Sequence, residues 1–107
     1  MPKYMIEAAY SPEGLKGVIA KGGSSRRTAI QAMAESLGGS VDALYFAFGD
    51  SDIFVVIDMP DNVSTAAVMM TVSASGALSN AKTTVLLTPE DVDEAAKKSV
   101  DYSPPGS

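Results

Sequence analysis

Two short apolar runs separated by a polar turn dominate the hydrophobic pattern of the chain. Residues 43–48 read Ala-Leu-Tyr-Phe-Ala-Phe and residues 53–58 read Ile-Phe-Val-Val-Ile-Asp, with Gly49 to Asp52 between them. Two such runs around a turn rich in Gly, Asp and Ser predict a β-hairpin. The residues expected on one face of its first strand are Leu44, Phe46 and Phe48, and those expected on the other are Ala43, Tyr45 and Ala47. A half-solvated strand would alternate apolar and polar residues, so we expect this sheet to be covered on both sides.

Helix caps and hydrophobic periodicity predict the remaining elements. The run Ser11-Pro12-Glu13 is typical of a helix start, as is Thr88-Pro89-Glu90. Asn62, although part of an Asn-x-Ser sequon, is expected to cap a third helix. We expect strands over residues 3–10 and 78–87, helices from Pro12 to the glycine pair 22–23, from Ser24 or Ser25 to Leu37 and over 63–74, a short helix after Thr88 with Val92 and Ala95 facing inward, and an extended tail over 101–107.

The order of these elements predicts an α+β fold in one domain, residues 1–107. The series β, α, β, β, α, β, with one added helix, is the ferredoxin-like βαββαβ arrangement, a four-stranded antiparallel sheet with helices on one face. A chain of 107 residues can cover one sheet face with its own helices but hardly both. Leaving ~6 apolar side chains wet would forfeit on the order of 10 kcal/mol. We therefore expect a homodimer, or a larger homo-oligomer, packed sheet against sheet.

The residue types that are missing exclude several kinds of chemistry. The chain has no cysteine and no histidine, so it lacks a thiolate nucleophile, a disulfide framework, and the commonest general base and metal or haem ligand. We expect neither a metal site nor a cofactor. With 13 acidic and 8 basic residues the net charge is −5, and no basic stripe offsets it, so nucleic-acid binding is not expected.

The chain also shows no targeting or membrane segment. Its opening residues include Lys3 and Glu7, where a signal peptide would need an apolar core. No apolar run approaches the ~20 residues of a membrane span. We expect a soluble, cytoplasmic protein without a membrane partner.

The hairpin turn is the first candidate site. Asp50 and Asp52 lie two residues apart, and such a pair can bind a cation or act as acid and base. The alternative is an ordinary turn, for which Gly, Asp and Ser suit the backbone. A calcium loop would need further oxygen ligands at set spacing, and these are missing. Asp52 is the more interesting of the pair because it borders the buried strand.

The second candidate is the segment Gly22-Gly-Ser-Ser-Arg-Arg27. Its backbone amides, hydroxyls and guanidinium groups suit a phosphate or a carboxylate. The alternative is a glycine-rich break between helices followed by solvated arginines. Consecutive helical residues point in different directions, so we expect that Arg26 and Arg27 do not act together.

Individual strand and helix residues supply the other candidates. Glu7 shares a strand face with Met5 and Ala9, where a carboxylate could have a raised pKa and act as a base, or could pair across the sheet. Strand tyrosines can donate to a ligand or belong to the core and rim, and the pair Met69-Met70 can line an adaptable pocket or fill the core. The residues that we expect to bind a ligand are Glu7, Tyr10, Arg26, Tyr45, Asp50 and Asp52.

Several short segments spread along nearly the whole chain resemble the GYD-domain family, which is named for a Gly-x-Tyr-Asp signature in the central hairpin. They are Met1-Pro-Lys-Tyr4, Tyr10-Ser-Pro-Glu-Gly14, Gly22-Gly-Ser-Ser-Arg-Arg27, Leu37-Gly-Gly39, Phe46-Ala-Phe-Gly-Asp50, Leu87-Thr-Pro-Glu90 and Lys98-Ser-Val-Asp-Tyr102. The resemblance implies a ferredoxin-like fold of the dimeric α/β-barrel type, but no particular activity. Gly49 and Asp52 match the signature, whereas Ser51 stands where the family has its tyrosine. The resemblance therefore does not extend to any chemistry of that tyrosine.

Two functions remain open at this point. The first is a non-catalytic homo-oligomeric module that binds a small ligand or builds an assembly. The alternative is a cofactor-independent enzyme of the monooxygenase, isomerase or decarboxylase type, which acts on a small hydrophobic substrate; this rests on analogy between folds. The lack of histidine favours the non-catalytic module.

Overall fold

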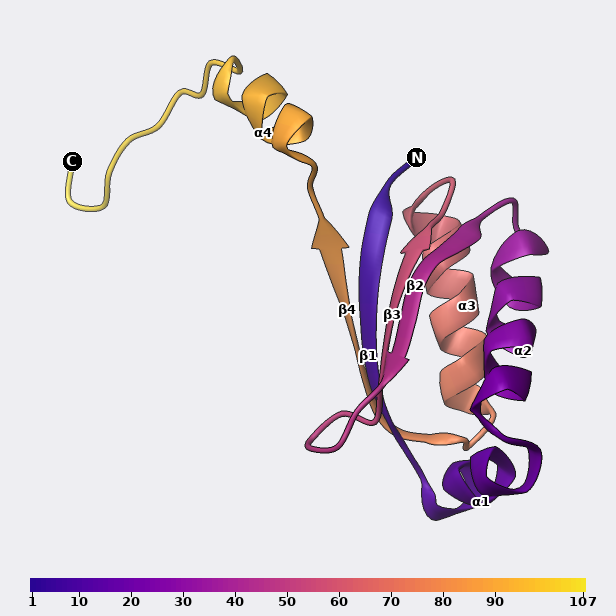
Figure 1. Cartoon of the computed structure of the whole chain (residues 1–107). Coiled ribbons are helices and arrows are strands. Elements are labelled where there is room, and N and C mark those ends of the chain that lie inside the picture. Colours follow the sequence, from indigo (N-terminus) through magenta and orange to yellow (C-terminus); the bar gives the residue numbers. More distant parts are fainter.

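The computed structural model describes residues 1–107 as a four-stranded sheet with four helices (Figure 1). The elements are β1 (Lys3–Tyr10), α1 (Pro12–Lys21), α2 (Gly23–Glu35), β2 (Ser40–Phe46), β3 (Ile53–Asp58), α3 (Asn62–Ala74), β4 (Leu78–Leu86) and α4 (Pro89–Ala96). The strand order is β2-β3-β1-β4, and all neighbours are antiparallel. Helices α2 and α3 lie on one side of this sheet (Figure 1). The predicted α+β, ferredoxin-like architecture is confirmed.

The core lies between the sheet and the two covering helices. Period-two alternation along β3 directs Ile53, Val55 and Ile57 toward the helices, where they are buried. Tyr4 and Ala8 of β1 occupy the same face and are also buried. The hydroxyl of Tyr4 donates to Oδ1 of Asn62, so this buried phenol has its hydrogen-bond partner.

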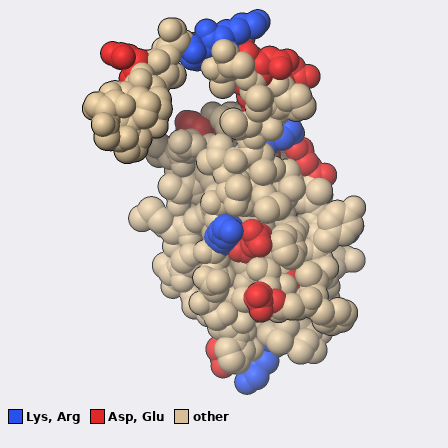
Figure 2. Space-filling view, turned by 90° about the vertical axis from the view of Figure 1, so that its left-hand side faces the viewer, with Lys and Arg blue, Asp and Glu red and all other residues tan.

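The other face of the sheet carries apolar residues together with the charged residues Glu7 and Lys82, and the chain leaves it uncovered. The register pairs Met5 with Val56 and Tyr45 with Phe54, and these four side chains alternate with the helix-facing rows. Figure 2, viewed from the side opposite α2 and α3, shows this surface as mostly uncharged with a few charged groups. We call it the open sheet face.

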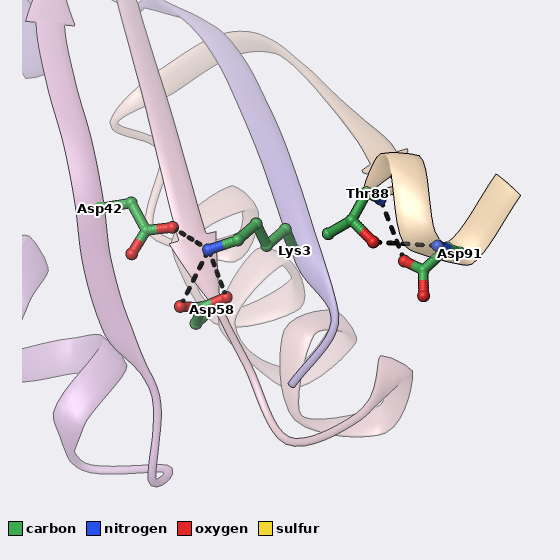
Figure 3. Close-up of polar contacts among 5 residues, drawn as sticks. All are labelled: Lys3, Asp42, Asp58, Thr88 and Asp91. Atoms are coloured by element: carbon green, nitrogen blue, oxygen red, sulfur yellow. Dashed lines mark hydrogen bonds and ion pairs between the residues drawn. The ribbon is translucent and has the colours of Figure 1, made fainter. Parts of the chain in front are cut away.

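One end of the open sheet face carries a charged cluster. The Nζ of Lys3 donates to Oδ1 of Asp58 at 3.0 Å and also to Asp42 (Figure 3). These hydrogen bonds to Asp42 and Asp58 raise the pKa of Lys3. Because the cluster is exposed to solvent, it adds little to stability.

The predicted strand 43–48 is shifted in the structure. Strand β2 begins at Ser40, three residues before the predicted start at Ala43. A bulge between Val41 and Ala43 interrupts its alternation of faces. It ends at Phe46, and the amide of Ala47 then donates to the carbonyl oxygen of Asp52 at 2.8 Å across the turn. Phe48 therefore lies in the loop, fully exposed, and its predicted place beside Leu44 is wrong.

The helix boundaries differ from the predicted ones by one or two residues. Gly22 has φ +87° and separates α1 from α2, as the glycine pair predicts. Helix α2 ends at Glu35 rather than Leu37. The cap of α3 is Asp61 rather than Asn62, because Oδ1 of Asp61 accepts from the amide of Ser64 at 2.8 Å.

This cap makes a pH-dependent contribution that can be measured. The hydrogen bonds from Ser64 lower the pKa of Asp61 below its ordinary value of 3.8. A lowered folded-state pKa adds stability that is present above 3.8 and is lost as the pH falls through the folded-state value. Asp61→Asn keeps an acceptor at the cap but removes the titration. In denaturant unfolding, the wild type should therefore lose its advantage over Asp61→Asn in acid, and an advantage that stayed constant with pH would contradict this.

The chain leaves the sheet after β4 and projects away from it (Figure 1). Helix α4 has a capping box, in which the amide of Asp91 donates to Oγ1 of Thr88 and the amide of Thr88 donates to Oδ2 of Asp91 (Figure 3). Nothing in the chain covers it: Val92 is 53% exposed and Ala95 is also exposed, so the prediction that they face inward is wrong. We call residues 87–107 the C-terminal arm.

The C-terminal arm makes the molecule elongated. The radius of gyration is 16.9 Å, whereas a compact chain of this length has a radius of about 13 Å. Residues 97–107 contain turns but no helix or strand. None of the helices combines the length and apolar character needed to cross a bilayer.

Candidate ligand-binding site

A cavity of about 320 Å³ lies between the sheet and helices α2 and α3. Of its 18 lining residues, 15 are hydrophobic. Ile6 and Val55 form its floor on the sheet, Met33 reaches it from α2, and Met69 and Val72 reach it from α3. This volume is within the range of about 300–1,000 Å³ that small-molecule sites occupy.

Few polar groups reach this cavity. Arg26 comes from the first turn of α2, Thr71 from the C-terminal half of α3, and Ser75 from the C-cap that follows α3. The phenol of Tyr10 lines the wall at the end of β1. An apolar chamber with a small number of polar groups is typical of a site that orients a hydrophobic molecule.

A second, more polar groove of about 350 Å³ lies between α1 and α2. It shares Tyr10, Arg26 and Ala77 with the apolar cavity. Its other lining residues include Lys21 and Ser25. The shared residues form a boundary with an apolar chamber on one side and a polar groove on the other.

Two hydrogen bonds made by Ser11 hold this boundary in place. The amide of Ser11 donates to the carbonyl oxygen of Ala77 at 2.9 Å, and the hydroxyl of Ser11 donates to that of Gly76 at 2.6 Å. The turn between β1 and α1 is thereby joined to the turn between α3 and β4. Tyr10, which immediately precedes Ser11, is held at the cavity wall by the same contacts.

The protonation state of Tyr10 follows from its surroundings. Burial raises the pKa of Tyr10 above 10.0, the positive charge of Arg26 opposes this increase, and the negative charge of Asp52 adds to it. Because the net effect is upward, Tyr10 is a protonated phenol at neutral pH. It can donate one hydrogen bond into the site.

Asp52 has a structural task beside the site. Its Oδ2 accepts from the amide of Tyr10 at 2.9 Å, and its own amide donates to the carbonyl oxygen of Ala8 at 2.8 Å. These bonds join the hairpin turn to β1. The side chain lines neither the cavity nor the groove, so Asp52 acts on the site through Tyr10.

The structure does not bring the other expected ligand-binding residues to this place. Glu7 and Tyr45 lie on the open sheet face, where Tyr45 is 73% exposed. Asp50 lies in the exposed hairpin turn. No group of three or more acidic side chains is arranged to hold a metal ion. Of the expected set, only Tyr10 and Arg26 line the cavity, with Asp52 behind Tyr10.

Sequence reasoning missed part of the site. Thr71 and Ser75 line the cavity but were not among the expected residues, because small residues surround α3 and its inner face cannot be read from periodicity. The two methionines separate: Met69 lines the cavity, whereas Met70 is 72% exposed. Arg26 and Arg27 also separate as expected, since Arg26 is half-buried and Arg27 is exposed.

The fold and the cavity together define a small α+β protein with a ligand-sized chamber between one sheet face and its helices. The model of the GYD domain family matches residues 4–96, which is most of the chain. The chain belongs to the GYD-domain family, as the dispersed motifs indicated. A comparison with curated proteins gives no match.

Proposed function

We propose that this chain is a soluble, cytoplasmic, homodimeric module that binds a small hydrophobic molecule in each subunit without transforming it. The observation that carries the proposal is the apolar cavity between the sheet and helices α2 and α3. The chain's own side chains do not fill this chamber, so its lining lacks the packing contacts of a close-packed core. A ligand that fills it restores those contacts and stabilises the fold.

The titratable groups of the cavity favour binding over catalysis. Tyr10 and Arg26 are the two ionisable side chains that line it. The pKa of Tyr10 is raised, mainly by burial, so its phenol does not act as a base at neutral pH. Arginine does not lose its proton in proteins. A cofactor-independent enzyme that begins by removing a proton from its substrate needs a base, and neither side chain supplies one.

The open sheet face supports the homodimer. Met5, Phe54 and Val56 form an apolar patch beside Glu7 and Lys82, and the chain has no cover of its own for this patch. Two such faces packed together would bury both apolar patches, as sheets do in other two-layer folds. Only 10 of 107 residues are buried in the single chain, so a partner would add substantially to its core.

The C-terminal arm gives a second reason to expect a partner. Its exposed apolar side chains lie outside the hydrophobic core of their own chain; they are Leu87, Val92, Val100 and Tyr102. The arm leaves the end of β4, which is an edge strand of the sheet that forms the open face. We assign its apolar side chains to packing on the second copy.

Filling the cavity with a larger side chain should weaken ligand binding. Val72 lines the cavity from α3, so Val72→Phe would occupy the space that a ligand needs. Binding of Nile red, a neutral dye that fluoresces in apolar surroundings, should weaken by about tenfold or more in this variant. Fluorescence titration of the wild type and the variant measures the difference.

Val63→Phe is the matched control for this experiment. Val63 lies on the same helix but is 79% exposed, so the same substitution adds an aromatic ring outside the cavity. Dye binding should be unchanged in this variant. If the wild type did not bind the dye, or if both variants bound it equally well, the cavity would not be the binding site.

A further inference from the structure

We propose that the ligand is a small amphipathic acid, with its apolar body in the cavity and its carboxylate in the groove beside Arg26. This inference rests on the proposed binding function and specifies the class of ligand. It follows from the boundary between the two spaces, which Tyr10, Arg26 and Ala77 form together.

Arg26 has no partner for its charge within the chain. The ion pairs of the structure join Lys3 to Asp42 and Asp58, and Lys16 to Glu13, and none includes Arg26. Its side chain is half-buried and lines both spaces. A partly desolvated guanidinium without an anion is unfavourable, and a carboxylate supplies the planar pair of acceptors that matches its two parallel N–H donors.

The charges of the groove point the same way. Lys21 lines it together with Arg26 and is also outside every ion pair. The one carboxylate in the groove, that of Glu13, lies 3.9 Å from Nζ of Lys16. The groove is therefore locally positive in a chain whose net charge is −5, and a positive pocket on an acidic protein favours an anion.

Hydroxyl donors at the boundary complete the recognition. The protonated phenol of Tyr10 and the hydroxyl of Ser25 lie in the lining around Arg26. Asp52, which would repel an anion, is outside both linings and is turned to the amide of Tyr10. A carboxylate here would meet donors, while the apolar lining of the cavity takes the remainder of the molecule.

Decanoate and decanol provide a direct test, because they share one apolar chain and differ in the charged head. Isothermal titration calorimetry of the wild-type protein, below the concentration at which decanoate forms micelles, should give at least about tenfold tighter binding for decanoate. In Arg26→Gln this preference should fall below about twofold. In Arg27→Gln, which removes the same charge from the adjacent exposed position, the preference should stay as in the wild type.

The outcomes separate the inference from the function on which it rests. If decanol bound the wild type as tightly as decanoate, the acid would be the wrong ligand class, but the cavity would still be a binding site. If neither compound bound, the binding function itself would fail. The comparison of decanoate with decanol in the wild type needs no variant. It therefore tests the ligand class even if Arg26→Gln does not fold. Equal losses in the Arg26 and Arg27 variants would assign the preference to overall charge and overturn the role of Arg26.

Discussion

Replacing Val56 with aspartate should convert the proposed dimer into a folded monomer. Val56 lies near the middle of the open sheet face, paired with Met5 on one side and Ala43 on the other. In a dry interface between two sheets an unpaired carboxylate costs several kcal/mol. In the monomer the same side chain points into water, and the helix-facing core is untouched. The dimer dissociation constant should rise by about a thousandfold or more.

Native mass spectrometry and light scattering measure this change directly. Val63→Asp is the control, because it introduces the same charge at a residue that is 79% exposed on α3, which covers the opposite side of the sheet. We expect this variant to stay a dimer. A wild type with the mass of one chain, or a Val56→Asp protein that remained dimeric, would refute the sheet-to-sheet assembly. Circular dichroism confirms that each variant is folded.

The contrast between Val56 and its neighbour Val55 shows how much of the fold the sequence contains. Alternation predicts that the two residues lie on opposite faces, and Val55 is indeed buried under the helices whereas Val56 is not. Alternation does not show which face the helices cover when both faces are apolar. That choice depends on the handedness of the connections through α2 and α3, which is a property of the whole chain.

The differences from the predicted elements have local and long-range causes. Strand β2 ends at Phe46 and the chain turns over residues 47–52, although residues 43–48 form one apolar run without a signal for that end. Helix α4 was predicted correctly from its cap, because a capping box is local. Its surroundings were predicted wrongly, since α4 packs on nothing in its own chain.

The candidate site was predictable only in part, because it depends on contacts between segments far apart in the chain. Helical periodicity in α2 predicts that Arg26 and Arg27 point in different directions, and Tyr10 lies at the end of a predicted strand. Each of the two cavity residues, Tyr10 and Arg26, could therefore be named as a candidate from its own segment alone. Whether Tyr10 and Arg26 come together depends on the contact between the β1–α1 turn and the α3–β4 turn. That contact is made by Ser11 with Gly76 and Ala77. The sequence offers no signal for that contact, although it determines where the cavity and the groove adjoin.

The close approach of α1 to this junction can be tested with a pair of glycines. A Cβ atom added to Gly14 would lie 2.1 Å from the carbonyl oxygen of Ala77, whereas one added to Gly17 would meet nothing within 4 Å. Both residues lie within α1, so both substitutions by alanine bring the same gain in helix propensity. They differ in whether the new methyl group can be accommodated.

Gly14→Ala should therefore destabilise the protein by about 2–3 kcal/mol, because backbone atoms at Ala77 must move. Gly17→Ala should stabilise it by roughly 0.5–1 kcal/mol, because alanine loses less conformational entropy in a helix. Urea unfolding of the two variants and the wild type gives both values. Equal stabilities would mean that α1 does not rest on the α3–β4 turn. In that case the boundary formed by Tyr10, Arg26 and Ala77 would lack this structural support. The proposed division into an apolar chamber and a positive groove would then be wrong.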